Sequence, residues 1–316
     1  MNAKDVESEI QHWDLGRDVA QTVRLQIDLL LDYTVKSVKN KEERRNRHLL
    51  ALKYLLCYVE NSGLQDILKM DVAQEAEFAF LLRKQMGESN VNTTKFIAFC
   101  RKTLFLEAKE INWEANIWYV EKLNISPERY SLSSTIDSFS FLDIRKEDNR
   151  KVLQEYLKYF FVVTNLNLGT IRIKQTYIKG FLKYLEKQEK TITTIDANSV
   201  KEYFEKLSIQ RTSPQSYNNK IQAVTIFLQY LQMKDYVNHF AIPVFFYKKK
   251  SYPKNHEVRD LDKKLDLFML HLSEFPEQLR IMSLILLYTG INKGKIFLLR
   301  NVDFYYENED SWMKVP

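Results

Sequence analysis

The sequence predicts a mainly α-helical protein. Its 316 residues include only seven Gly and six Pro, far below the average usage of about 7% and 5%, so tight turns and helix breaks are few. Apolar residues recur at helical spacing through most of the chain, with polar residues on the opposite face. The order of the predicted helices also occurs twice, and the length is typical of two or three domains.

Composition places the chain among ordinary folded proteins, with 45% hydrophobic and 28% charged residues. Cys57 and Cys100 are too few for a disulfide scaffold and form no metal-binding motif, so we expect a reducing compartment and no cofactor. The charged N-terminal stretch has no signal core, and the longest nearly apolar run, Ile281 to Tyr288, is too short to cross a bilayer. We therefore expect a cytoplasmic protein without membrane contact. A net charge of +6 is compatible with a nucleic-acid partner without proving one.

Residues 1–111 are predicted to form an N-terminal helical domain. Helices are expected over 14–40 and 47–61, the second ending at Ser62-Gly63. Asp71 has the residue type of an N-cap for the next helix, and Thr93 opens another after a polar break at 87–92.

Residues 112–145 are expected to be a connector, because they have weak periodicity and several turn formers. Within it, 136–141 alternates like a short strand. A second helical domain is predicted over 146–243. Its expected helices comprise 146–163, 177–189, one capped by Asp196 and one opened by Ser216.

The two helical domains show the same order of helix, loop, N-capped helix, polar loop and helix. Tyr58 corresponds to Tyr184 and Asp71 to Asp196 at nearly the same spacing. Helical sequences also reach such matches by drift, so an internal duplication is a hypothesis that the fold can test.

A Pro-flanked basic segment, 244–259, is the predicted linker to a last domain at 260–316. Helices are expected there over 261–272 and 276–288. Gly290 should end the second of them, since only Gly enters the left-handed conformation without steric cost. The chain would then reverse inside a buried helix pair and finish, over 307–316, with a turn entering a strand.

Seven residues after the second helix fit a known pattern: Thr289, Gly290, Ile291, Ile296, Leu299, Val302 and Asp303. They resemble the entrance to the catalytic domain of the tyrosine recombinase, or phage integrase, family. The resemblance is strongest over 165–304, weaker over 45–110 and absent from the first 40 residues. It implies two small helical SAM-like core-binding domains, followed by the start of a mixed α/β tyrosine-recombinase catalytic domain. Two helical DNA-binding units ahead of the catalytic domain suit the large transposon-type transposases and integrases better than the compact members that resolve chromosome dimers. This step is an analogy from architecture.

The resemblance also implies a DNA-facing helix in the second domain. Hydroxyl, amide and basic side chains around its start can contact phosphates or base edges: Arg211, Thr212, Ser213, Gln215, Ser216, Asn218, Asn219 and Lys220. The alternative is that the hydroxyls only cap a helix.

Four lysines in the linker, Lys248, Lys249, Lys250 and Lys254, are interleaved with aromatic residues. They are candidates for a strap on the DNA backbone, or simply for a solvated linker. The equivalent places in the first domain are taken by Thr93, Thr94, Lys95 and Arg101, where the alternative is packing.

Catalysis in this family needs a tyrosine nucleophile. It also needs arginines that clamp the scissile phosphate. Asn292 stands at the position of the family's first arginine, and Lys295 where a glutamate is usual. The remaining catalytic motifs would lie beyond Pro316, so we predict no catalytic residue in this chain. It would be a fragment or a degenerate member.

The expected function is therefore the DNA-binding portion of an enzyme for DNA recombination, in integration or transposition. Its partners would be double-stranded DNA and further recombinase subunits, or a second copy of the chain on paired sites. A non-catalytic helical DNA-binding regulator or a protein-interaction scaffold is the competing prediction.

Overall fold

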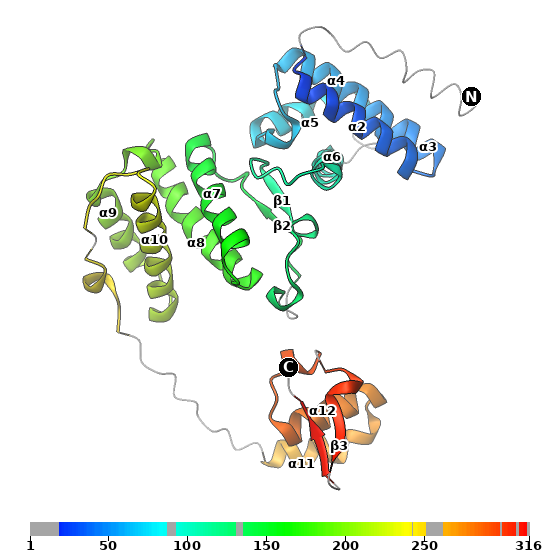
Figure 1. Ribbon diagram of the computed structural model, residues 1–316, viewed down its shortest axis with the longest axis vertical. Helices are drawn as coiled ribbons and strands as arrows, with labels where there is room; N and C mark the ends of the chain where they lie inside the picture. The colour runs from blue at the N-terminus through cyan, green and yellow to red at the C-terminus, as the bar shows by residue number, and fades with distance from the viewer. Residues whose placement is uncertain are drawn as a thin grey trace. The chain divides into compact units, whose positions relative to one another are not determined.

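The computed structural model describes residues 19–86, 93–130, 135–241, 243–250, 262–297, 299–307 and 310–314. The chain divides into two compact units. The described residues from 19 to 249, apart from residue 135, form the first unit, and the described residues from 250 onward lie in the second. This division falls within the predicted 244–259 linker. The mainly helical fold class is confirmed (Figure 1).

The first unit begins with a helical group that we call the first repeat. Its helices are α2 (Gln21–Ser37), α3 (Lys41–Glu43), α4 (Leu50–Ser62), α5 (Val72–Met86) and α6 (Thr93–Glu107), with a π-helical stretch η1 (Arg44–Leu49) before α4 and a 3-10 turn η2 (Ile67–Lys69) after it.

Two predicted helix boundaries of the first repeat are confirmed. Gly63 ends α4 in the left-handed conformation, with φ at +65°. Asp71 accepts a hydrogen bond from the Gln74 backbone N–H at 2.9 Å, and the Gln74 side chain accepts one from the Asp71 N–H at 3.0 Å. This reciprocal arrangement satisfies two of the unpaired donors at the start of α5.

The connector after α6 is a packed part of the core. Strand β1 (Ile117–Tyr119) pairs antiparallel with β2 (Ser138–Ser140), and Trp118 lies opposite Phe139. Both of these side chains are fully buried. The strand expected at 136–141 is confirmed by β2, whereas β1 was not predicted.

Two 3-10 turns, η3 (Val120–Lys122) and η4 (Pro127–Arg129), lie between β1 and β2 along the chain. Arg129 is buried and donates to the carbonyl oxygens of Leu166, Phe161 and Phe160 at 2.9, 3.0 and 2.9 Å. It thereby satisfies carbonyls at the end of α7 that have no partner within the helix.

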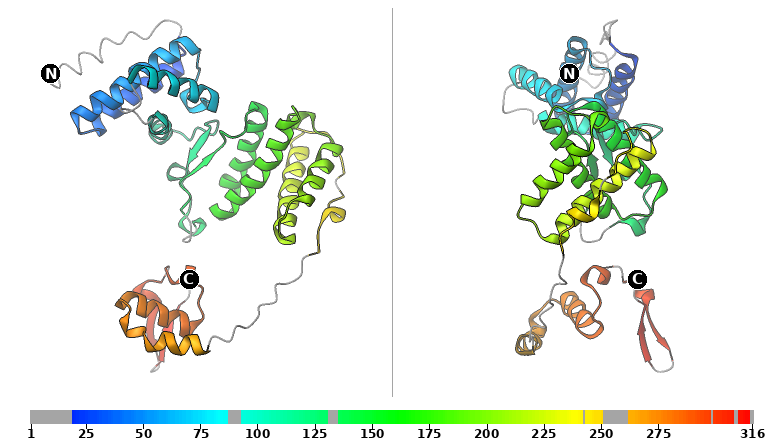
Figure 2. Two further views of the ribbon diagram at one scale, coloured as in Figure 1. Left: turned by 180° about the vertical axis from the view of Figure 1, so that it is seen from behind. Right: turned by 90° about the vertical axis from the view of Figure 1, so that its left-hand side faces the viewer.

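The second repeat contains four long helices. They are α7 (Glu147–Val163), α8 (Leu168–Lys187), α9 (Ala197–Ile209) and α10 (Pro214–Met233), with 3-10 turns η5 (Ile192–Thr194) before α9 and η6 (Val244–Tyr247) after α10. In the views of Figures 1 and 2 these helices lie against one another, and α8 contacts α7, α9 and α10. Asp196 caps α9 as predicted, accepting from the Ser199 N–H at 2.8 Å. Helix α8 begins nine residues earlier than the predicted 177, because the Asn167 side chain caps it through the Gly169 N–H at 2.7 Å.

The repeats share local contacts as well as element order. The Tyr58 hydroxyl donates to Glu77 at 3.1 Å, and the Tyr184 hydroxyl donates to Glu202 at 3.3 Å. The ring of Tyr58 also lies 5.6 Å from that of Phe78, and the ring of Tyr184 lies 5.2 Å from that of Tyr203. The same pairs recur at the same places between corresponding helices, which supports the duplication hypothesis.

One hydrophobic cluster runs through both repeats and the connector, from Val19 to Val237. The division into three predicted domains stays a prediction, but no break in this cluster separates the two repeats.

The second unit contains α11 (Asp262–Leu270), η7 (Leu272–Glu274), α12 (Glu277–Thr289), α13 (Lys293–Ile296), η8 (Asn301–Asp303) and the antiparallel hairpin of β3 (Phe304–Glu307) and β4 (Asp310–Met313). The hairpin, at the C-terminal end in Figure 2, confirms the strand expected near the end of the sequence and adds β3. Gly290 ends α12 with φ at +64°, as predicted.

The expected burial of this helix pair is not observed. No residue of α12 is buried, although the helix is strongly apolar. Among the described residues of the second unit, Leu272, Ile296 and Asp303 are the buried ones. Across the described part of the chain, no helix combines the length and the apolar character needed to cross a membrane.

Candidate nucleic-acid interface

The start of α10 presents a cluster of polar and basic side chains. Ser213 is the N-cap, and its hydroxyl accepts from the Ser216 N–H at 3.2 Å; Pro214 follows in the first turn. Tyr217, Ile221 and Val224 are buried against the rest of the repeat. Since buried positions define the inner face, the start of the helix and its outer side are left open to a ligand.

Four of the predicted DNA-binding residues at this helix start are exposed: Arg211, Ser213, Gln215 and Asn219. Thr212, Ser216 and Lys220 are half-buried, and the Thr212 hydroxyl is buried with no hydrogen-bond partner in the described structure. Backbone N–H groups in the first turn of a helix attract phosphate, and the Arg211 guanidinium adds a positive charge beside them.

Asn218 and Lys249 are engaged with each other. The Asn218 amide donates to the Lys249 carbonyl at 2.8 Å, and its oxygen accepts from the Lys249 N–H at 2.9 Å. The Lys249 ammonium donates to the Ser208 carbonyl at 2.8 Å and lies 4.4 Å from the centre of the Tyr217 ring. These two side chains therefore hold the beginning of the linker against the second repeat, a role that the sequence did not indicate.

The other linker lysines have different positions. Lys248 and Lys250 are exposed on either side of the Lys249 contact. Lys254 lies outside the described residues. The held segment keeps the Lys248 side chain near the start of α10, since Asn218 belongs to that helix.

In the first repeat, Thr93 and Thr94 begin α6 as predicted, but their side chains lie outside the described residues, and Lys95 is exposed. The prediction for Arg101 is wrong. Its side chain is only 3% exposed, donating to Glu75 and to the Met70 carbonyl, each at 2.8 Å. A guanidinium enclosed in this way has no surface to offer DNA.

Asn292 has a structural role in the second unit. It caps α13, accepting from the Gly294 N–H at 2.9 Å. A neutral amide cannot form the charged two-point contact that a guanidinium makes with phosphate. Arg300 is largely exposed, and its Nε lies 3.8 Å from the Asp303 carboxylate.

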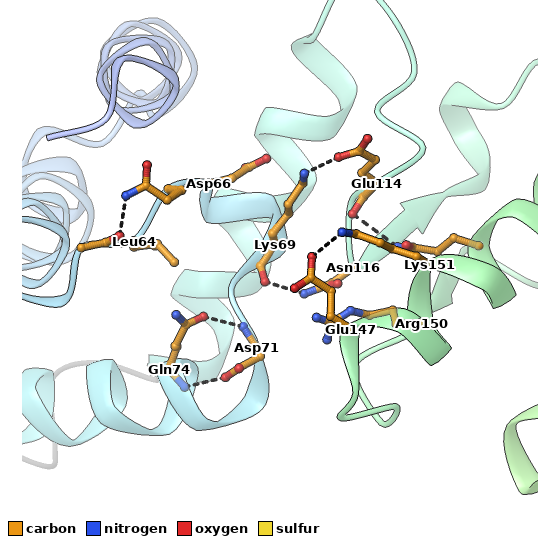
Figure 3. Close-up of a pocket in the computed structure, with 13 residues that line it drawn as sticks. Leu64, Asp66, Lys69, Asp71, Gln74, Glu114, Asn116, Glu147, Arg150 and Lys151 are labelled. Carbon is orange, nitrogen blue, oxygen red and sulfur yellow. Dashed lines mark hydrogen bonds and ion pairs between the residues drawn. The ribbon is translucent and has the colours of Figure 1, made fainter. Parts of the chain in front are cut away.

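A polar cavity of about 280 Å³ lies where the first repeat, the connector and α7 meet (Figure 3). Its acidic and basic side chains pair with each other: Lys69 with Glu114, and Lys151 with Glu147 at 2.8 Å. This internal pairing leaves the cavity little net charge to attract nucleic acid.

A second hollow lies between α8, α9 and the start of α10. Its volume is about 350 Å³, and its basic and aromatic lining was not predicted. The residues concerned are Lys183, Lys187, Lys206, Lys220, Tyr177, Tyr184 and Tyr203. The available sequence signal was the pair Lys183 and Lys187, four residues apart on one helix face.

The second repeat thus forms a small helical domain with a basic, polar helix start at one edge. Residues 153–234, which run from within α7 to the end of α10, match the family model of the phage integrase N-terminal SAM-like domain. This match supports the tyrosine recombinase family and the SAM-like fold predicted for this part of the chain. No curated protein and no solved structure gave a significant match.

Proposed function

We propose that this chain is the DNA-binding portion of a site-specific recombinase or transposase of the tyrosine recombinase family. The observation that carries the proposal is the position of the basic, polar start of α10 within the segment 153–234 that matches the integrase domain. The duplex backbone would lie along Arg211, Gln215 and Asn219, with Lys248 and Lys250 adding charge from the linker.

DNA binding is tested by fluorescence anisotropy with a labelled random-sequence duplex at several salt concentrations. We expect the logarithm of the affinity to fall linearly with the logarithm of salt, with a slope of about −0.9 for each phosphate neutralised. Arg211→Gln should make the slope shallower by about one contact. Lys53→Gln, at an exposed position on α4, makes the same change in net charge and should leave the slope unchanged.

A protein-interaction scaffold, the competing function, would give a salt slope near zero for every variant. A DNA-binding regulator would share the steep slope. A steep slope with preference for one inverted-repeat sequence over random duplex would favour the recombinase over the scaffold.

We further propose that these residues do not cleave DNA on their own. Asn292 occupies the predicted place of a phosphate-clamping arginine, and its side-chain oxygen is engaged as a helix cap. Incubation with supercoiled plasmid and with nicked suicide substrates should therefore give neither relaxation nor a covalent protein–DNA adduct. A stable adduct at a tyrosine would contradict this proposal.

A further inference from the structure

The hollow between α8, α9 and α10 has the lining of an anion-binding groove. We call it the lysine groove, and define it by Lys183, Lys187, Lys206 and Lys220. Among the described residues that line it, none is acidic. Lysine ammonium groups gathered around a concave surface raise the local concentration of anions.

The groove has a defined floor. Tyr184 and Tyr203 are largely buried, and the Lys206 ammonium lies 5.1 Å from the centre of the Tyr184 ring. Gly180 on α8 leaves space in the groove because it has no side chain. A Cβ atom at this position would stand 3.4 Å from the Tyr203 hydroxyl. Any larger side chain at this position would take up space in the groove.

The lysines have unequal freedom to meet a ligand. The Lys183 ammonium lies 2.6 Å from the Asp143 carboxylate. Burial opposes ionisation of that carboxyl, yet the hydrogen bonds from Lys179 and Lys183 hold the pKa of Asp143 below its usual value. Lys187 and Lys206 are exposed, and among the described residues neither forms an ion pair with an acidic side chain. They are the better probes of the groove.

Comparison with the first repeat shows that the fold does not require these lysines. The corresponding positions there, set by the recurring Tyr–carboxylate pair and the helix starts, hold Cys57, Asn61 and Leu81. Both repeats have the same helix order and the same tyrosine contact at this place. The lysines therefore distinguish the second repeat by charge and not by architecture.

The groove is continuous with the start of α10. The Lys220 ammonium donates to the Gln210 side chain at 3.3 Å, and both residues line the groove. Gln210 directly precedes Arg211. A phosphate chain lying against Arg211 can thus continue into the groove without leaving the protein surface.

We infer that the lysine groove binds the backbone phosphates of the same DNA duplex, extending its path from α10 to α8 and α9. This inference rests on the proposed function and deepens it. Lys187 and Lys206 would each neutralise a phosphate, and the tyrosine floor would lie beneath the sugar–phosphate chain.

The test compares two double variants of the full chain. K187Q/K206Q should bind the random-sequence duplex about tenfold more weakly near physiological salt, with a slope shallower by about two contacts. K53Q/K84Q alters the charge equally at exposed positions on α4 and α5 and should bind like the unmodified chain. Circular dichroism and urea midpoints establish that each variant is folded.

A third variant tests the shape of the groove without changing charge. Gly180→Gln replaces a mid-helix glycine with a better helix former, so stability should hold or rise while duplex affinity falls severalfold.

The outcomes separate the two levels of the proposal. If Arg211→Gln weakens binding but K187Q/K206Q behaves like K53Q/K84Q, the groove inference is overturned and the DNA-binding function stands. If the unmodified chain shows no salt-dependent duplex binding, both are overturned. If K187Q/K206Q loses affinity only for single-stranded RNA, the groove serves another ligand and the inference is wrong.

Discussion

Arg101 and Lys102 are neighbours on α6 with contrasting surroundings. Arg101 is enclosed and paired with Glu75, whereas Lys102 meets Glu121 at 3.2 Å with side chains 54% and 65% exposed. Removing one partner of a buried pair leaves a charge without compensation, which costs far more than losing an exposed pair.

We predict that Arg101→Met lowers the free energy of unfolding by about 3 kcal/mol. Lys102→Gln, the matched change at the next residue, should cost about 0.5 kcal/mol or less. Urea denaturation of both variants measures the difference. If the two variants lost equal free energy of unfolding, the Arg101 side chain would be open to solvent. It would then again be a candidate surface residue for DNA binding.

His48 makes stability depend on pH. Its ring lies edge-on to Phe99, with centroids 4.7 Å apart, and its Nδ1 is buried without a hydrogen-bond partner in the described structure. Burial lowers the pKa of the imidazole from 6.5, with Glu43 opposing the shift and Arg47 adding to it. The folded state therefore favours the neutral ring. This stabilisation is complete above pH 6.5 and is lost as pH falls through the lowered pKa.

We predict that the free energy of unfolding falls more between pH 7.5 and 5.5 in the unmodified chain than in His48→Leu, which has no titrating ring. Urea titrations at the two pH values measure the comparison, and an NMR titration of the His48 ring gives its pKa directly. A pKa at or above 6.5 would contradict the proposed cause.

Short-range signals explain which residue roles the sequence could predict. Gly63, Gly290, Asp71 and Asp196 act within one helical turn, so each could be assigned before the fold was known. Arg101 could not, because its burial depends on how α6 packs on residues some 30 positions earlier.

At the scale of elements, long amphipathic helices were predicted well and short strands were not. Strand β1 has only three residues, and its pairing with β2 lies across a long loop. Nothing local distinguishes such a strand from a turn. The lysine groove was missed for a similar reason, since its members come from three helices.

The Asn218–Lys249 contact joins two elements, α10 and the beginning of the linker. The Asn218 side chain makes two hydrogen bonds to the Lys249 backbone. Each such bond contributes about 0.5–1.5 kcal/mol. Without them, the segment should open more often from the second repeat.

We predict that Asn218→Ala speeds limited tryptic cleavage at Lys248 to Lys250 roughly tenfold. This factor corresponds to a loss of about 1.4 kcal/mol in the free energy that holds the segment against the second repeat. Asn219→Ala, on the exposed side of the same helix, should leave the cleavage rate unchanged. Mass spectrometry of the early fragments identifies the site. Equal cleavage of both variants would mean that the linker is held by other contacts.

At the scale of the whole molecule, the two units differ in how far they bury their apolar residues. The first unit encloses a cluster that runs from Val19 to Val237. In the second unit, α12 is rich in apolar residues, and none of its residues is buried. The sequence predicted apolar character correctly for both units, but apolar character does not specify which surface covers a helix. Apolar side chains on a helix stabilise a fixed fold only when other elements pack against them.

This asymmetry predicts different behaviour for the two units when they are separated. Residues 1–249 should unfold in one cooperative urea transition at the midpoint of the main transition of the full chain, because their core is continuous. Residues 250–316 should bind the dye ANS and unfold over a broad range, as expected of helices without fixed packing. Fluorescence and circular dichroism, recorded together, distinguish the two. A sharp transition without dye binding in the 250–316 fragment would show that its few buried residues, Leu272, Ile296 and Asp303 among those described, are enough for a fixed fold.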